Sequence, residues 1–493
     1  MDTTLQRKLR RADRRNRRLE AFNRTTKIPE LLSLIFIHCI PENGVQPNSR
    51  RAPLNIAHVC QHWRTVAHST PRVWSRVRLK HKNLTDDVVD RYTALLKHWL
   101  SLSANLPISL DLRISGRPTP RSYRDLSETD IVDGMNNDYD AIKRMLEFVV
   151  RYSPRWRNVT ICTYPDLLQP LYRIFGRESP NLESYHLLPF PGIIHQRYGA
   201  IYSQHEHIDL SHNTKLQEAT LIWHHSDVSL IHISPSLLTL EVKTRELRLI
   251  TDASHDYALR RLCCGGFVLP LQTLFTASTI FLHLEHLEIL LRSPIEGLGS
   301  LKGTLTFHRL RLLKVMIVKP LYINRVSEDP AKAFFDHLLA PELRSLIVDW
   351  STPFSPRELQ QRPHAKHLVQ RSGKCLRSLS LINTHIPEDG IVSLLECLPS
   401  LTNLNISGRI SNKQIFNTLT LPRHYAVDNG GIGDQSATTG LCPHLESLSL
   451  LFGLPPSSET ILNLLASRIS DLSGSNQTEL RSSNPSVFQI EEL

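Results

Sequence analysis

Short segments in which apolar residues alternate with polar ones recur along most of the chain. The clearest follow the pattern Leu-x-x-Leu-x-apolar, and weaker copies precede them. The clear copies are Leu343–Val348, Leu376–Leu381, Leu401–Ile406 and Leu445–Leu450, and the weaker ones begin at Trp156, Leu182, Leu216, Leu237, Leu259, Leu284 and Leu310. Alternation over so few residues predicts short strands with one buried face.

The spacing of these segments predicts repeats. Six of the ten distances between successive segments lie between 20 and 29 residues, and each short strand needs a neighbour on both sides to bury its apolar face. Between Leu376 and Leu401, four apolar residues at helical spacing predict a helix: Ile391, Leu394, Leu395 and Leu398.

The pattern resembles a leucine-rich repeat, but the usual asparagine is missing after the strands. Ser351, Thr384, Arg409 and Gly453 stand in its place, so we expect irregular repeats. The resemblance implies an α/β solenoid over residues 156–467, with parallel strands on the concave face and helices on the convex face. A non-repeat α/β domain with several Leu-rich strands is the alternative.

Residues 28–78 predict a small helical domain. Pro29 and Glu30 suit the first turn of a helix, and the following residues to Cys39 are apolar nearly all round, so this helix must be covered on all sides. A second helix is expected from the apolar spacing of Ile56, Val59, Cys60, Trp63, Val66 and Ala67. Thr70 is expected to cap a short turn that begins at Pro71 and carries Val73 and Trp74.

About 50 residues bury too little surface to be securely stable alone. Residues on the second helix cover only one side of the first. The uncovered side of Glu30–Cys39 therefore predicts contact with another chain.

The same stretch resembles the F-box of the large fungal families. The matching motifs are Pro29-Glu30-Leu31-Leu32, Ile35-Phe36, Val59-Cys60-Gln61-His62-Trp63-Arg64 and Ser69-Thr70-Pro71-Arg72-Val73-Trp74. The loop at 41–53 is longer than the family pattern. The resemblance implies binding to the Skp-family adaptor of a cullin–RING ubiquitin ligase. It implies that Ile28, Pro29, Leu31, Leu32, Ile35, Phe36, Val59, Cys60 and Trp63 form or support the adaptor interface, and that Val66, Ala67, Pro71 and Trp74 support the F-box core. The alternative is a helical element that packs only on its own chain.

The remaining segments connect these two regions or follow them. Residues 79–155 are expected to lead into the repeats, with a helix at 90–102, a strand at 106–114, an exposed loop at 115–139 and a helix at 140–151. Residues 421–441 are expected to form an insertion and 457–465 a last helix. The polar tail at 468–493 is expected to be flexible.

The positive charge of the chain is concentrated at its start. Residues 1–27 hold ten Lys and Arg against three acidic side chains, which is +7 of the total net charge of +11. This basic arm suits a nuclear-localisation signal, a polyanion-binding tail or a solvated lead-in. It has no aromatic residue before Phe22 for stacking on bases, so nucleic acid is not the expected partner.

No motif for catalysis, cofactor binding or metal binding is recognised in the sequence. Gly297-Leu-Gly299 and Gly431-Ile-Gly433 lack the rest of a phosphate loop, and the histidine pairs lack ligand partners at metal spacing. The eight cysteines are scattered, as expected for reduced thiols in the cytoplasm or nucleus. No segment predicts a membrane span or secretion.

The predicted function is therefore that of a non-catalytic substrate receptor in a Skp–cullin–F-box ubiquitin ligase. The F-box would bind the adaptor, and the repeats would bind a protein substrate. Two alternatives remain: a repeat scaffold without a ligase role, and a nuclear polyanion binder that uses the basic arm.

Overall fold

The structure is a computed structural model. It describes residues 27–116 apart from 43, 128–168, 171–172, 179–189, 206–222, 229–243, 247–268 apart from 253 and 254, 271–292, 304–318, 330–350, 364–408 apart from 385 and 387, 413–421, 441–452, 458–470 and 488–492, with 13, 14 and 17. The chain divides into two compact units. Unit 1 holds residues 1–199 and 208–223, and unit 2 holds 200–207 and 224–493.

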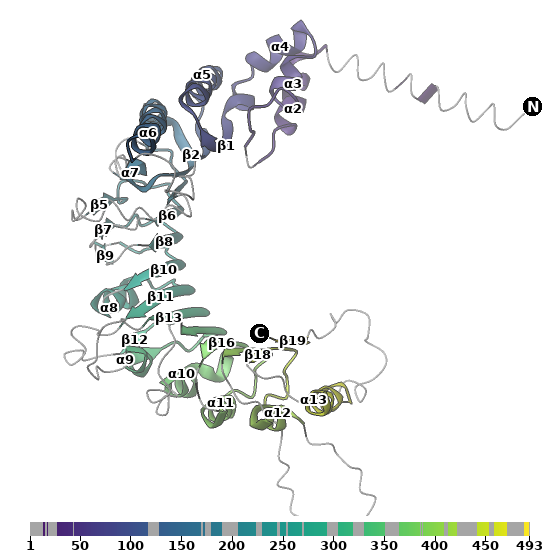
Figure 1. The fold of residues 1–493 in the computed structure, drawn as a ribbon, viewed down its shortest axis with the longest axis vertical. Helices are drawn as coiled ribbons and strands as arrows, with labels where there is room; N and C mark the ends of the chain where they lie inside the picture. The colour runs from purple at the N-terminus through teal and green to yellow at the C-terminus, as the bar shows by residue number, and fades with distance from the viewer. Residues whose placement is uncertain are drawn as a thin grey trace, which may run out of the picture. The chain divides into compact units, whose positions relative to one another are not determined.

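Unit 1 begins with helices and continues with strands and helices in alternation (Figure 1). Its helical domain comprises α2 (Pro29–His38), α3 (Leu54–Ala57), α4 (Gln61–His68) and the 3-10 turn η1 (Pro71–Trp74). The following elements are β1 (Arg76–Leu84), α5 (Asp86–Leu102), β2 (Ile108–Gly116), α6 (Glu128–Val150), η2 (Ser153–Arg155), β3 (Trp156–Thr163), α7 (Pro165–Leu168), β4 (Ser184–Pro189) and β6 (Glu218–Ile222).

The strands of unit 1 form a parallel sheet in the order β1-β2-β3-β4-β6. Val77 and Leu79 of β1 are buried and lie beside Leu110 and Leu112 of β2. The residues between them point to the opposite face of the sheet, because side chains alternate along a strand. Helices α5 and α6 pack against each other and lie on one side of the strands (Figure 1).

Unit 2 begins with several strands in succession, and helices lie between most of its later strands. Its elements are β7 (Ser229–His232), β8 (Thr239–Lys243), β9 (Leu247–Ile250), β10 (Arg261–Val268), α8 (Leu271–Ile280), β11 (His286–Arg292), β12 (Leu305–Thr306), β13 (Leu312–Val318), α9 (Pro330–His337), β14 (Leu338–Leu339), β15 (Ser345–Trp350), α10 (His364–Ser372), η7 (Gly373–Cys375), β16 (Ser378–Thr384), α11 (Glu388–Leu395), β17 (Asn403–Gly408), α12 (Lys413–Leu419), β18 (Ser447–Phe452), α13 (Ser458–Ser470) and β19 (Phe488–Glu492).

The strands of unit 2 that follow the leucine pattern are parallel and paired with their neighbours in chain order. The sheet runs β8-β10-β11-β13-β15-β16-β17-β18-β19. In the four clear copies of the pattern, all three apolar positions are buried, and every weaker copy in either unit also runs into a parallel strand. The prediction of an α/β fold with short parallel strands at these positions is confirmed.

Helices connect the later strands of unit 2. Helices α9, α10, α11, α12 and α13 each contact the next one along the chain, and in Figure 1 they follow one another on one side of the strands. The predicted helical residues Ile391, Leu394 and Leu395 are buried in α11, and Leu398 is buried just after it. The predicted last helix is present as α13 and extends to Ser470.

Several boundaries differ from those expected. Within residues 79–155, β2 and the remainder of β1 belong to the unit 1 sheet, since β1 and β2 pair in line with β3. The exposed loop predicted at 115–139 is wrong from Glu128 onward, because α6 begins there. The tail predicted to be flexible contains β19, which extends the sheet beside β18. Short strands that the pattern missed include β5 (Glu206–Asp209), β7, β9, β12 and β14.

Four expectations lie wholly or partly outside the described residues. They are most of the basic arm at 1–27, residues 117–127 of the predicted loop, the insertion at 421–441 except its two ends, and residues 471–487 of the predicted tail. Within the part of the chain that the structure describes, no helix is both long and apolar enough to cross a bilayer.

Candidate functional site: an exposed apolar surface on the helical domain

Helix α2 has one buried side and one exposed side, although it is apolar nearly all round. Pro29 and Glu30 lie in its first turn, as predicted. Leu32 and Phe36 are buried, and the ring of Phe36 lies 5.2 Å from the ring of Trp63 on α4, at an angle of 56°. Trp63 is half-buried. Packing of α2 on α4 therefore covers only the side of α2 that carries Leu32 and Phe36.

The other side of α2 carries large apolar side chains that nothing in the described chain covers. Ile28, Leu31, Leu34 and Ile35 are between 39% and 52% exposed. At 100° per residue they span an arc of roughly 120° around the helix. Val59, which is 60% exposed, lies in the turn before α4. We call these five residues the apolar surface: Ile28, Leu31, Leu34, Ile35 and Val59.

The turn that carries Val59 interrupts the second helix predicted from the sequence. Residues 54–68 form two short helices, α3 and α4, instead of one. Cys60 is extended and caps α4, where its Sγ accepts a hydrogen bond from the backbone N–H of Trp63 at 3.4 Å. Arg64 holds the two helices together, because its Nε donates to the carbonyl oxygen of Ala57 at 3.0 Å. The break in the helix leaves Val59 exposed, where a continuous stripe would have turned it inward.

The residues that the resemblance assigned to the adaptor interface fall into two groups. Most are exposed: Ile28, Pro29, Leu31, Ile35, Val59 and Cys60. Leu32 and Phe36 are buried in the domain itself, so they support the apolar surface and do not lie on it. Leu34 was missed, although it lies on the same arc of α2 as Leu31 and Ile35.

The residues assigned to the F-box core are mostly buried. Val66, Ala67 and Trp74 are inaccessible, and Pro71 is half-buried. The indole Nε1 of Trp74 donates to the carbonyl oxygen of Ala67 at 2.8 Å, which ties η1 to α4. Thr70 lies at the N-cap position of η1, which begins at Pro71 as predicted, but its side chain makes no capping hydrogen bond. Its hydroxyl donates back to the carbonyl oxygen of Val66 at 2.7 Å.

The long loop after α2 joins the helical domain to the sheet. Val45 forms a parallel bridge with Val77 of β1, and the N–H of Arg78 donates to the carbonyl oxygen of Val45 at 2.9 Å. Gly44, just before it, has φ of +80°, a conformation that favours glycine. The loop therefore lies along the edge of β1, and the helical domain shares its core with the first strand.

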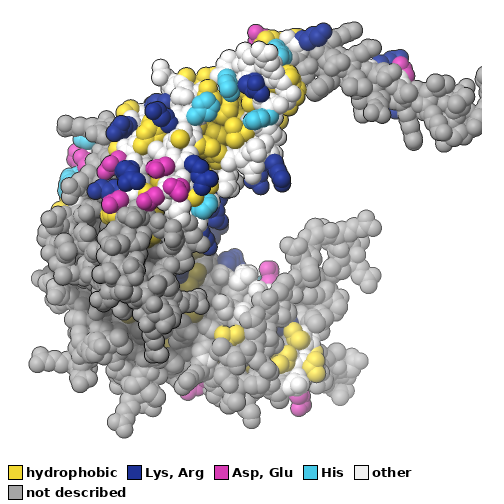
Figure 2. Space-filling model, turned by 45° about the horizontal axis from the view of Figure 1, so that its top comes forward, with side chains coloured by type: hydrophobic (Ala, Val, Ile, Leu, Met, Phe, Trp, Pro, Cys, Tyr) yellow, Lys and Arg dark blue, Asp and Glu magenta, His cyan; other side chains and the backbone are white. Residues whose placement is uncertain are grey.

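Polar and charged groups surround the apolar surface. The exposed groups are His38 on α2, His58 directly after α3 and Arg64 on α4. Figure 2 shows hydrophobic side chains gathered over the N-terminal helices, with histidine and basic side chains around them. An apolar centre inside a polar rim is the usual composition of a protein–protein interface.

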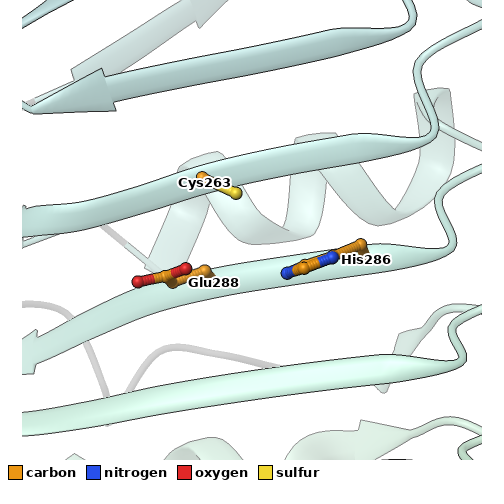
Figure 3. Close-up of side chains that lie close together, drawn as sticks. All are labelled: Cys263, His286 and Glu288. Atoms are coloured by element: carbon orange, nitrogen blue, oxygen red, sulfur yellow. The ribbon is translucent and has the colours of Figure 1, made fainter.

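A second cluster, on the sheet of unit 2, has the residue types of a metal site. Cys263 lies on β10, with His286 and Glu288 beside it on β11 (Figure 3). Their donor atoms lie within 4.8 Å of one another, and this is the one such group within the described residues. Three ligands of these types match a zinc site with one open position.

Two cations already occupy the donors of this cluster. Arg261 donates from Nε to the Sγ of Cys263 at 3.3 Å, and Lys314 donates from Nζ to Glu288 at 2.8 Å. Burial raises the pKa of the Cys263 thiol, and the bond from Arg261 opposes that rise. A divalent ion would have to displace both cations. The geometry is therefore that of an ion-paired polar cluster on the strand face.

The comparisons with known proteins add no relative. No protein-family model matches the chain, and no curated protein is similar to it in sequence. We therefore infer function from the apolar surface and the motifs that form it.

Proposed function

We propose that this chain is the substrate-recognition subunit of a Skp–cullin–F-box ubiquitin ligase, acting in the cytoplasm or nucleus. Its helical domain would bind a Skp-family adaptor through the apolar surface, and through the adaptor a cullin–RING ligase. Other subunits would carry out the catalysis. The F-box resemblance of residues 28–78 supplies the class of partner.

The concentration of exposed apolar side chains on the helical domain is the observation that carries this proposal. Eight large apolar side chains are exposed among those the structure describes, and the five of the apolar surface all lie between residues 28 and 59. Four of the five lie on one arc of α2, and grouped exposed apolar side chains mark interaction sites, whereas scattered ones need no explanation. The exposed face supports the proposal that another protein covers this domain.

The repeats would supply the second half of the function. The leucine pattern, its period and the parallel strands it produces support a leucine-rich-repeat type of array. In such an array the side chains on the face opposite the helices project from every strand and offer a long surface for a protein substrate. The substrate would be held there while the ligase transfers ubiquitin to it.

A repeat scaffold without a ligase role is the second candidate. It is favoured by the packing of Trp74 on Trp99 of α5, which makes the helical domain continuous with the sheet, as a cap would be. A cap, however, exists to bury apolar surface. The exposure of Ile35 and Val59 argues against a cap, because both side chains stay exposed on the domain that would form it.

Co-expression with a Skp-family adaptor and cullin tests the proposal. The intact chain should retain both partners in a pull-down, and the double variant Leu31→Asp/Ile35→Asp should retain neither. Leu282→Asp is the matched control, since Leu282 is also exposed but lies in unit 2. If the intact chain folds and retains no adaptor, the ligase proposal fails and the scaffold is left.

A further inference from the structure

Unit 1 contains a groove that the adaptor proposal does not use. It has a volume of about 590 Å³ and lies on the face of the sheet formed by β1, β2 and β3. Glu42 and Gly44, from the loop after α2, form one wall. The groove therefore lies between the loop after α2 and the first three strands, within a single compact unit.

Four arginines line this groove and give it a positive charge. They are Arg76, Arg78, Arg113 and Arg157, against the two acidic side chains Glu42 and Asp111. Arg76 and Arg78 point to the same face because they alternate with the buried Val77 and Leu79 on β1. The neighbouring strands add the polar side chains of Ser109, Asn158 and Thr160, and Val77 and Leu110 also line the groove.

The acidic side chains only partly neutralise the arginines. Asp111 bridges two of them, since its Oδ2 lies 3.0 Å from the Nε of Arg78 and its Oδ1 lies 2.9 Å from the Nε of Arg113. Arg157 pairs through Nε with Glu183 at 2.8 Å. Each of these contacts uses one N–H of a guanidinium that has five.

Arg76 differs from the other three. It is half-buried, and among the described residues no acidic side chain pairs with it. A guanidinium held in a groove without a counterion favours an anionic ligand, and its planar fork matches a carboxylate.

We propose that this groove binds an extended, acidic segment of a protein partner. Arg76 and Arg78 stand two residues apart on a strand, a separation of roughly 7 Å, which is also the separation of alternate side chains in an extended peptide. Acidic residues at alternate positions would therefore meet successive arginines. Because no aromatic side chain among the described residues lines the groove, these residues offer no platform for nucleic-acid bases.

The inference that this partner is the ligase's substrate rests on the proposed function. The charge and polarity of the groove are independent of that proposal. A substrate segment held here would lie in the same unit as the adaptor-binding helices. Peptide binding and adaptor binding are separate measurements, so either one can fail while the other holds.

Fluorescence anisotropy on the purified full chain tests the proposal. The probe is a labelled twelve-residue peptide in which Glu alternates with Ser (about six carboxylates), and the control peptide has Gln at each Glu. We expect the acidic peptide to bind, its affinity to fall as salt is raised, and the Gln peptide not to bind. A labelled single-stranded oligonucleotide of the same charge serves as competitor, and tighter binding of the oligonucleotide would overturn the assignment.

Two variants with opposite expected effects place the peptide in the groove. Arg76→Gln should weaken binding about tenfold, because a hydrogen-bonded ion pair is lost. Asp111→Asn should strengthen binding severalfold, because it releases Arg78 and Arg113 from the carboxylate they share. Unfolding of the protein would not produce a gain in affinity.

Lys97→Gln is the matched control, since it removes one positive charge from the exposed face of α5. Thermal melting of each variant shows whether it is folded. If Arg76→Gln binds the acidic peptide as tightly as Lys97→Gln does, the groove is not the binding site. This comparison decides the matter even if Asp111→Asn fails to fold.

Discussion

Trp74 and Trp99 meet edge to face, with ring centroids 4.9 Å apart and an angle of 78° between the rings. Both indoles are buried. Trp74 ends the helical domain and Trp99 lies on α5, which packs on β1. The contact therefore joins the helical domain to the sheet of unit 1 through one continuous core.

Removing either indole should destabilise the helical domain and the first strands together. We expect Trp74→Ala to lower the free energy of unfolding of unit 1 by about 3–5 kcal/mol, through lost burial and the cavity left behind. In a double-mutant cycle with Trp99→Ala, the coupling should be about 0.5–1.5 kcal/mol. Hydrogen exchange checks the extent of the effect, because amides of α4 and β1 should both lose protection. Loss of protection in α4 alone would mean that the helical domain is independent of the sheet.

Phe36 and Leu34 should separate folding from binding, although they are two residues apart on α2. Phe36 is buried against Trp63, so Phe36→Ala should cost about 3–5 kcal/mol of stability. Leu34 is exposed, so Leu34→Ala should change stability by less than about 0.5 kcal/mol and still weaken adaptor binding. Chemical denaturation measures the stability of each variant. Equal loss of stability in both would show that Leu34 is covered by its own chain.

His286 should make unit 2 less stable in mild acid. Burial lowers the pKa of its imidazole below the usual value, and the positive charge of Arg261 lowers it further. The unfolded chain keeps a pKa near 6.5. As the pH falls below that value the unfolded state takes up a proton first, so stability present at neutral pH is lost as the pH approaches the folded pKa.

The variant His286→Gln should reduce this loss. We expect its thermal midpoint to fall less between pH 7.5 and 5.5 than that of the wild type. The exposed His308 provides the control substitution, His308→Gln. If the two variants show the same dependence on pH, His286 does not contribute in this way.

The strands were the most predictable part of the fold. Pairs of apolar residues such as Leu379 and Leu381, or Leu404 and Ile406, identify the buried face of their strand directly, since every second side chain of a strand points inward. Strand β19 was missed because the surrounding tail is polar. The first half of α6 was missed because its Asp and Asn residues are typical of loops, and the rest of the helix carries the apolar stripe.

The candidate site was predictable in its location and only partly in its residues. A helix as apolar as α2 does not reveal which arc faces its own core. In the structure, Trp63 packs on Phe36, so the side of α2 that carries Phe36 faces the core. Val59 is exposed because the helix breaks before α4. The spacing of Val59 with Ile56 and Trp63 is typical of a continuous helix and gives no sign of that break. The groove was not predictable, since its wall at Glu42 and its floor at Asn158 come together only in the folded chain.

The dissociation constant of a purified Skp-family adaptor, measured by calorimetry on single variants, tests the central claim most directly. The wild type and Leu282→Asp should bind equally well. Ile35→Asp and Val59→Asp should each weaken binding by about 2 kcal/mol or more, roughly thirtyfold, because each would bury a charge in the proposed apolar interface. Equal binding by all four proteins, or no binding by the folded wild type, would contradict the assignment of the apolar surface to the adaptor.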